Sequence, residues 1–346
     1  MAAAVALDVL GIVQGILNIV QTMLKFPYDQ GEFTSQVRVT VGLDVQGGID
    51  FSGDLPDVRL FNEVGEFLGA KFDPGLIHEG SFMDLKVDQK RSNQQPTYAL
   101  FVGNKNPICI SHVSIKWPSG EHYAWLADWG RKCNGSWYHS NVYAAPNHKS
   151  SCLWIGLDSM TRTGFQVHWP EFINDPKKPL PGDKAALEKK TNWFCRGAPT
   201  FKMYTHPDPK NIYCWNSTQE GNETAVSFGP PKPLPLAEPQ PAPQKHKPKK
   251  NLRSIILQSL VIGKDEQQSA EGLCESATSF GPSFLDMHSR KYCRMSDKTL
   301  WPVCDAAKTK KDCFDKDKKR LVTDNIMTNE VPYINIIDWT LEPENA

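Results

Sequence analysis

The 346-residue chain has no net charge, because 39 basic side chains balance 39 acidic ones. Proteins that bind nucleic acids usually carry a basic face, so we expect no nucleic-acid partner. The chain also lacks a Walker A sequence, a GxGxxG motif after a strand, an HExxH motif and a GxSxG elbow. These absences remove the common signatures of nucleotide, zinc-peptidase and serine-hydrolase chemistry. We expect neither a cofactor nor a metal.

Long hydrophobic segments are scarce as well. The uncharged stretch Val9–Leu24 is short for a membrane span and carries a polar strip of Gln14, Asn18 and Gln21. No basic residues precede it, unlike in a signal peptide. We therefore predict that residues 1–26 form an apolar helix packed on the mature protein. A signal sequence and a membrane-surface helix are the alternatives, and no stable membrane insertion is expected.

None of the nine cysteines forms a CxxC pair, which argues against a structural zinc site. Disulfides are the better interpretation, and they imply an oxidising compartment. The candidates are Cys109, Cys133, Cys152, Cys195, Cys214, Cys274, Cys293, Cys304 and Cys313. The last four are an even number, so two bridges can close in the tail, in any of three pairings. The odd cysteine then belongs to the first domain or bridges to the second.

Three sequons support the same compartment. They place N-glycosylation candidates at Asn134, Asn216 and Asn222. Together with the cysteines they predict a secreted glycoprotein, although a typical signal peptide is not evident.

Short strand-like runs separated by turn residues follow one another through most of the chain. Gln36–Val45 alternates cleanly between apolar and polar residues, as a half-buried strand does. Between Pro27 and Asn222 we find almost no helical periodicity. The pattern predicts a mainly β fold, an antiparallel sandwich or barrel, in residues 27–228.

The segment 229–250 contains eight Pro and no aromatic residue, so we predict an extended linker. It leads to a small cysteine-containing C-terminal α+β module, residues 251–346. Within this module Leu252–Val261 is a possible helix, and Val331–Trp339 is predicted to be the last strand.

The dipeptide Asn134-Gly135 lies between two strand-like runs and predicts a hairpin with a two-residue turn. Alternation then sorts residues 122 to 143 into two faces. The predicted core face consists of Tyr123, Trp125, Ala127, Trp129, Tyr138 and Val142. The other face consists of His122, Asp128, Trp137, His139, Asn141 and Tyr143. Rings beside converging polar groups are typical of ligand sites, so we predict ligand binding on this second face, with ordinary sheet packing as the alternative.

Catalytic groups are less well defined by the sequence. Asp128, Arg131 and His139 are the candidates, and His168 joins the ligand-binding candidates because it points away from the core residues of its own strand. A Ser–His–Asp triad has no identifiable nucleophile. A paired-carboxylate glycosidase would draw on Asp84, Asp128 and Glu171, whose separations the sequence does not give.

Several blocks resemble a group of fungal secreted, cysteine-containing proteins of uncharacterised function. In the tail they are CESATSFGPSFLDMHSRKYCRMSDKTLWPVC and CFDKDKKRLV; earlier blocks are VRLFNEVGEFLGAKFDP, QQPTYALFVGNKNPICI and GFQVHWPEF. The resemblance implies a secretory route and no particular catalytic residue. A looser analogy of class links the chain to the fungal hetero-Diels–Alderases of tropolone–sesquiterpene biosynthesis, which are glycosylated and cofactor-free.

The sequence therefore predicts a secreted, disulfide-bonded, β-rich protein that binds a carbohydrate or a small hydrophobic organic ligand at an aromatic site. The first alternative is a cofactor-free cyclase of polyketide–terpenoid secondary metabolism. Such an enzyme needs a shaped aromatic cavity and a few donors that polarise a carbonyl, and it needs no nucleophile. The second alternative is an effector or structural protein. Whether the protein is an enzyme, and its oligomeric state, stay open at this stage.

Overall fold

The computed structural model describes residues 19, 33–43, 49, 51–90, 94–158, 161–172, 184–196, 199–215, 225–227, 252–305, 311–323, 326–327 and 333–341. The chain is mainly β, with several antiparallel sheets and few helices, as predicted. Of the predicted N-terminal helix only Ile19 is described, as a helical and buried residue. The rest of that helix and the Pro-rich segment 229–250 lie outside the described residues.

The first large sheet has six strands in the order β10-β11-β8-β1-β6, with β9 paired to β8. They are β1 (Thr34–Val41), β6 (Phe82–Asp88), β8 (Ile108–Lys116), β9 (His122–Leu126), β10 (Trp137–Ala145) and β11 (His148–Ile155). All their pairings are antiparallel. Strands β9 and β11 pair with different stretches of β8, and the chain passes from β9 to β10 through a helix.

The second large sheet has five antiparallel strands in the order β13-β12-β7-β3-β4. They are β3 (Asp57–Phe61), β4 (Phe67–Lys71), β7 (Tyr98–Val102), β12 (Gly164–His168) and β13 (Phe201–Tyr204). Two short pairs complete the β structure of this part, β2 (Gly53–Asp54) with β5 (Leu76–Ile77) and β14 (Tyr213–Trp215) with β15 (Ala225–Ser227).

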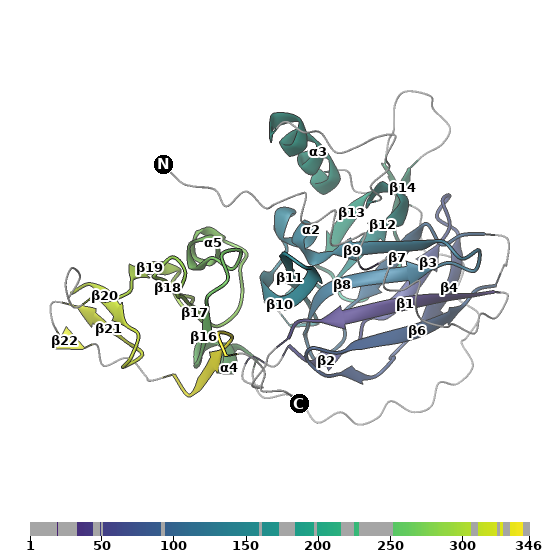
Figure 1. The fold of residues 1–346 in the computed structure, drawn as a ribbon. Helices are drawn as coiled ribbons and strands as arrows, with labels where there is room; N and C mark the ends of the chain where they lie inside the picture. Colours follow the sequence, from purple (N-terminus) through teal and green to yellow (C-terminus); the bar gives the residue numbers. More distant parts are fainter. Residues whose placement is uncertain are drawn as a thin grey trace.

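The main core lies between the two large sheets (Figure 1). Trp125 of β9 stacks on Phe165 of β12, with ring centroids 4.8 Å apart, and on Phe201 of β13. Each fully buried apolar side chain of this kind contributes about 1.5–3 kcal/mol. The outer face of the second sheet is buried too, because Leu100 packs in a second cluster with Tyr204. Strand β7 is therefore apolar on both faces and does not alternate.

Within the described residues, three helical segments interrupt the sandwich, where the sequence predicted almost none. They are α2 (Ala127–Lys132), the 3₁₀ turn η1 (Trp169–Phe172) and α3 (Lys184–Arg196). A six-residue helix such as α2 is too short to show a helical period. The described contacts of helix α3 with the sandwich come from Trp193, Phe194 and the Cys195 disulfide, three consecutive residues at the end of the helix that create no helical period in the sequence.

The C-terminal module is built on a five-stranded sheet of order β19-β18-β17-β16-β23. Its elements are α4 (Leu252–Leu257), β16 (Ser259–Gly263), α5 (Ala270–Glu275), β17 (Ser283–Asp286), β18 (Lys291–Arg294), β19 (Thr299–Pro302) and β23 (Asn335–Asp338). Strand β16 runs parallel to both β17 and β23, and α5 connects β16 to β17. A smaller sheet consists of β20 (Cys313–Asp315), β21 (Arg320–Thr323) and β22 (Ile326–Met327).

Two sequence predictions for this module meet different outcomes. The last strand, expected within Val331–Trp339, is confirmed as β23. The helix expected over Leu252–Val261 is wrong in its second half, because α4 ends at Leu257 and β16 begins at Ser259. All residues of β16 are buried, so its sequence is a continuous apolar run. Such a run does not distinguish a buried strand from a buried helix.

All nine cysteines lie in the described residues, and eight of them form four disulfides. The pairs are Cys109–Cys152, Cys133–Cys195, Cys274–Cys293 and Cys304–Cys313. The prediction of two bridges in the tail is confirmed, and the odd cysteine, Cys214, is a buried thiol of the first domain. Burial raises the pKa of Cys214 to about 11, so this thiol stays protonated at neutral pH. Four disulfides are consistent with an oxidising compartment.

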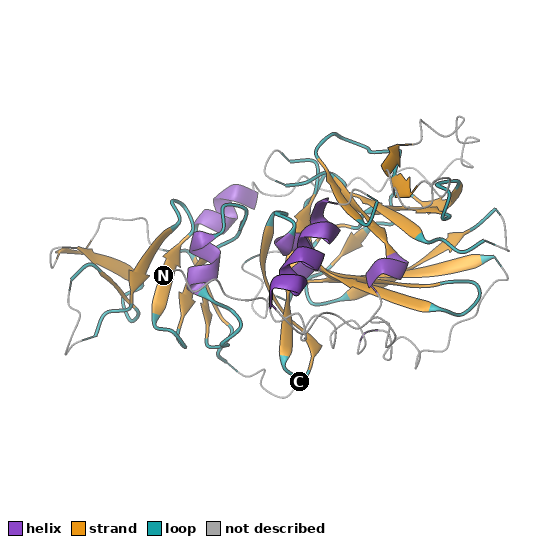
Figure 2. Cartoon of the chain, turned by 90° about the horizontal axis from the view of Figure 1, so that it is seen from above, coloured by secondary structure: helices purple, strands orange, loops and turns teal. Residues whose placement is uncertain are grey.

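The C-terminal module lies beside the sandwich at the β10 edge of its first sheet (Figures 1 and 2). Main-chain bonds join the two parts, since Trp137 N–H donates to the Thr278 carbonyl and Phe280 N–H donates to the Trp137 carbonyl. Tyr138 Oη donates to the Pro282 carbonyl at 3.0 Å, and Trp154 Nε1 donates to the Phe280 carbonyl at 2.9 Å. Residues of both parts belong to a single apolar cluster, so the module is docked through a shared core.

Candidate functional site

The predicted Asn-Gly hairpin does not exist. Residues 127–132 form α2, and the Asn134-Gly135 pair ends this helix. Gly135 N–H donates to the Gly130 carbonyl at 2.8 Å and Asn134 N–H donates to the Arg131 carbonyl at 3.2 Å. With Asn134 at a φ of 62°, these bonds form a Schellman motif, which closes helices with the same residues that favour a tight hairpin. The prediction of a hairpin with a two-residue turn is therefore wrong.

The predicted ligand-binding face of β10 is covered by the C-terminal module. Trp137 is 1% exposed and its indole N–H donates to Ser276 Oγ. His139 is 3% exposed, and its Nε2 lies 3.3 Å from the Ser269 carbonyl oxygen. Burial, with a smaller contribution from Arg131, lowers the pKa of His139 to about 3, so the imidazole is neutral at neutral pH. These two side chains belong to the interface with the module and present no open surface.

The remaining residues of that face do not gather at one place. A bulge between His139 and Val142 breaks the alternation of β10. Asn141 is buried and accepts a hydrogen bond from Lys149 Nζ, whereas Tyr143 is 61% exposed. His122 begins β9, five residues before α2, and is half-buried.

The catalytic candidates Asp128 and Arg131 lie on α2 beside this interface. Asp128 is buried and accepts hydrogen bonds from the Ser151 N–H at 3.1 Å and, at 3.2 Å, from His148 Nε2 when that nitrogen is protonated. The Arg131 guanidinium lies 3.7 Å from the centroid of the Trp137 ring. Burial lowers the pKa of Arg131 to about 10, and Asp128 opposes the shift. The structure thus brings Asp128, Arg131, Trp137 and His139 into one buried layer, to which His148 is an addition that the sequence did not single out.

His168 lies on the other sheet, at the end of β12. Its ring stacks on Tyr98 with centroids 4.1 Å apart, and its Nε2 is 2.9 Å from a Glu63 carboxylate oxygen. Its Nδ1 lies 3.4 Å from Glu171. Although burial alone would lower it, the pKa of His168 is raised because Glu171 and Glu63 stabilise the imidazolium. His168 is therefore the centre of an ion-pair cluster that is separate from the α2 layer.

The carboxylates proposed for a glycosidase are likewise distributed. Asp84 forms a bidentate pair with Arg38, Asp128 binds His148, and Glu171 accepts a hydrogen bond from Trp215 Nε1 at 2.6 Å. Each carboxylate has its own partner in a different network.

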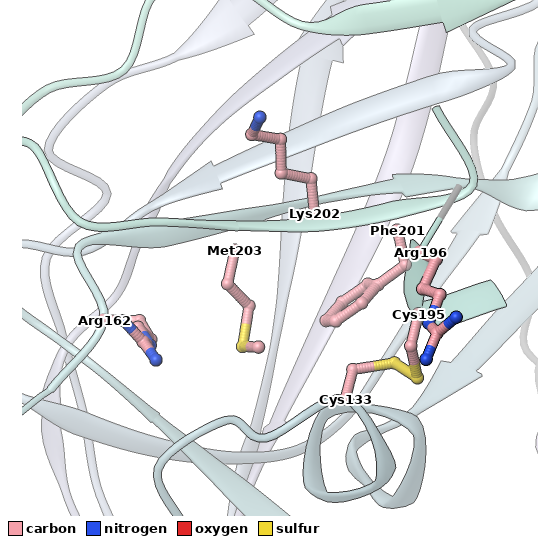
Figure 3. Close-up of a pocket in the computed structure, with 7 residues that line it drawn as sticks. All are labelled: Cys133, Arg162, Cys195, Arg196, Phe201, Lys202 and Met203. Carbon is pink, nitrogen blue, oxygen red and sulfur yellow. A yellow bond between two sulfur atoms is a disulfide. The ribbon is translucent and has the colours of Figure 1, made fainter. Parts of the chain in front are cut away.

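A cavity of about 330 Å³ lies where α3, the end of α2 and β13 meet (Figure 3). The residues that line it are Cys133, Arg162, Cys195, Arg196, Phe201, Lys202 and Met203. Its volume is at the lower end of the range for small-molecule sites. Among these residues only the two cysteines carry a signal in the sequence, because the others become neighbours only when β12, β13 and α3 are assembled.

The chemistry of the cavity is cationic and apolar. Arg162 and Arg196 lie at its two sides, and the Met203 side chain, the Phe201 ring and the Cys133–Cys195 disulfide lie between them (Figure 3). Lys202 points away, and its Nζ is 3.5 Å from the centroid of the Tyr213 ring. None of the described residues that line the cavity is acidic. Such a lining offers hydrogen-bond donors for an anion and an apolar contact for the remainder of a ligand.

The neighbourhood of the cavity includes one predicted glycosylation acceptor. Asn134 is exposed and directly follows Cys133 of the cavity wall. Asn216 and Asn222 lie outside the described residues.

Comparisons with known proteins give no family assignment. No protein-family model and no curated protein matches the chain. Within the described residues, no three or more His, Cys, Asp and Glu side chains converge as metal ligands. No described helix is long and apolar enough to cross a membrane.

Proposed function

We propose that the chain is a secreted, glycosylated protein that binds a small organic anion in the cavity between α2, α3 and β13. The observation that carries the proposal is that Arg162 and Arg196 lie at the two sides of the cavity, with Phe201 and Met203 as an apolar floor between them. Guanidinium groups recognise carboxylates through charged, directional hydrogen bonds. The apolar floor favours a ligand whose body is hydrophobic.

The setting agrees with a secretory protein. Four disulfides and an exposed Asn134 acceptor fit an oxidising, glycosylating route. The cavity itself favours a small organic anion over a carbohydrate as the ligand. A sugar site usually offers an accessible ring face and neutral hydrogen-bonding groups, whereas this cavity offers two cations.

Calorimetry with a matched pair of probes tests the proposal. We expect cinnamate to bind the intact protein and its uncharged isostere, cinnamamide, to bind at least tenfold more weakly. The double variant Arg162→Gln/Arg196→Gln should lose that preference, because a factor of ten corresponds to about 1.4 kcal/mol, less than one charged hydrogen bond contributes. Arg253→Gln, at an exposed position of α4, is the control and should bind as the wild type does.

Two outcomes would contradict this function. One is equal affinity for cinnamate and cinnamamide. The other is tight binding of a neutral oligosaccharide such as cellotetraose that persists in the double arginine variant, which would restore the carbohydrate interpretation.

A cofactor-free cyclase is the second candidate, and the same two guanidinium groups favour it. Donors held over an apolar floor can polarise the carbonyl of a bound enone while the floor orients the reacting partner. The test is the rate of cycloaddition between an α,β-unsaturated carbonyl compound and an electron-rich alkene. Acceleration by the wild type, but not by the double arginine variant, would support catalysis. Binding of cinnamate without acceleration would leave a binding protein.

A further inference from the structure

The four disulfides differ in their access to solvent. Cys109, Cys152, Cys293 and Cys313 are 0% exposed, so three of the bridges have at least one sulfur-bearing residue that is fully enclosed. In the Cys133–Cys195 bridge both residues are partly exposed, and both line the cavity. Thiol–disulfide exchange requires a thiolate to reach a sulfur atom. Cys304 is partly exposed as well, so what distinguishes Cys133–Cys195 is that both of its residues are partly exposed and both line the cavity.

The cavity also selects the kind of thiol. A thiolate, and any carboxylate on the same molecule, meets Arg162 and Arg196 and no acidic side chain among the described residues that line the wall. Arg196 follows Cys195 directly at the end of α3. Positive charges beside a disulfide stabilise both the incoming and the departing thiolate.

We propose that Cys133–Cys195 is an exchangeable disulfide, and that the cavity takes a low-molecular-weight thiol bearing carboxylates, such as a γ-glutamyl peptide thiol. The proposal rests on the proposed function for the position of the anion. It adds a covalent modification site and a class of reactant that simple ligand binding does not need.

The exchange balances without a further reactant. The sulfur of the small thiolate attacks Cys133 Sγ, the bond between Cys133 and Cys195 breaks, and its electron pair leaves on Cys195 as a thiolate beside Arg196. The products are a mixed disulfide at Cys133 and one free thiolate. Attack by Cys195 on the mixed disulfide reverses the step and releases the small thiol.

Exchange at this bridge would act on α3. In the described residues the helix contacts the sandwich through the Cys195 disulfide, through the buried Phe194 ring, which packs on Trp129 and Phe172, and through Trp193, which stacks on Trp215. Opening the bridge removes the covalent attachment at the end of the helix that forms one side of the cavity. The bridge thereby couples thiol chemistry to the shape of the ligand site.

The test compares glutathione with its diethyl ester, which has the same thiol but no free carboxylate. The folded, intact protein is treated with each thiol, quenched by alkylation and mapped by mass spectrometry. We expect a glutathione adduct on Cys133 and an alkyl label on Cys195 before any other disulfide reacts. At equal thiolate concentration, glutathione should react at least tenfold faster than the ester, as expected for attraction to a cationic cleft.

Charge variants separate attraction from access. Arg162→Gln/Arg196→Gln should remove the preference for glutathione, because the rate with glutathione should fall much more than the rate with the ester, whose thiolate is the one anionic group that meets the two arginines. Arg162→Lys/Arg196→Lys should restore most of the preference. Unchanged melting temperatures would show that these proteins are folded.

Equal rates with glutathione and its ester, or earlier reaction at Cys304–Cys313, would overturn the proposal. Binding of cinnamate with no selective exchange would reject the thiol and keep the proposed function. Selective exchange without cinnamate binding would support the exchangeable disulfide and reject the binding of an organic anion as the function.

Discussion

At the scale of single residues, His168 shows how burial and charge compete. Its ring is enclosed between Tyr98 and two carboxylates, Glu63 and Glu171, that come from different elements. The hydrogen bond to His168 lowers the pKa of Glu63. Burial lowers the pKa of His168, but the Glu171 and Glu63 carboxylates outweigh burial and raise it. The cluster also holds β14, because Glu171 binds the Trp215 indole and Tyr98 Oη accepts the Trp215 N–H.

This cluster predicts a pH dependence of stability. Because the His168 pKa is raised on folding, its contribution is complete below the unfolded-state pKa of about 6.5 and is lost as the pH rises through the folded-state pKa. Glu63, with a lowered pKa, contributes above about pH 4.5 and loses its contribution as the pH falls. Urea unfolding should therefore show a larger loss of stability from His168→Gln at about pH 5.5 than at about pH 8.5.

The partner variant is the control for this effect. Glu63→Gln keeps the shape of the side chain but removes its charge. In a protein that carries Glu63→Gln, the loss of stability caused by His168→Gln should therefore differ less between the two pH values. A loss of stability from His168→Gln that is the same at both pH values would show that the ring acts through packing alone.

At the scale of elements, α3 is attached to the sandwich by one buried ring, one partly exposed ring and one disulfide. Phe194 is 3% exposed and packs edge-on against Trp129, with centroids 4.8 Å apart, while its neighbour Trp193 is 43% exposed and stacks on Trp215. Helices of this length are marginal in water without tertiary contacts. The position of Arg196 beside the cavity therefore follows from two aromatic contacts and one disulfide, of which the Phe194 contact is the buried one.

Phe194→Ala should release α3 from the sandwich. Removal of a buried phenylalanine ring costs about 3–5 kcal/mol, and here most of that cost falls on the local attachment of the helix. Hydrogen exchange of residues 184–196 should become much faster, whereas Trp193→Ala should change it little. Equal effects of the two substitutions would mean that the helix is held by something other than the Phe194 ring.

At the scale of the whole molecule, the sandwich and the C-terminal module behave as one packed body. The module approaches the sandwich tightly where Gly281 contacts the Tyr138 ring. A Cβ at Gly281 would lie 2.2 Å from Tyr138 Cδ2 and would displace this fully buried ring. Gly272 of α5 also faces the sandwich, but its Cβ would lie 3.2 Å from the end of the Arg131 side chain and in ordinary contact with Ser269.

These two glycines make a matched pair of substitutions. Gly281→Ala should separate the module from β10, seen as a lower melting temperature and faster proteolysis between the two parts. Gly272→Ala should be neutral or slightly stabilising, since alanine favours a helix by about 1 kcal/mol over glycine. Full tolerance of Gly281→Ala would show that the interface can shift to accept a methyl group.

The sequence predicted the strands well where neighbours in the chain decide the pattern. Val37, Val39 and Val41 alternate with polar residues, and β1 forms there. The prediction failed at Asn134-Gly135, because the same left-handed residue can end a helix or turn a hairpin. Arg162, Arg196 and Met203 of the cavity carried no signal, because they belong to separate elements with no common spacing.

By itself, the sequence determined a mainly β chain with oxidised cysteines, including two bridges in the tail, since alternation and cysteine content are properties of local segments. The tertiary structure alone decided which cysteines pair, which face of β10 is covered and where a cavity forms. Those outcomes depend on contacts between distant residues, such as His139 with Ser269, 130 positions apart. Periodicity within one strand shows that a face is polar or aromatic, but the residue that covers the face comes from another part of the chain.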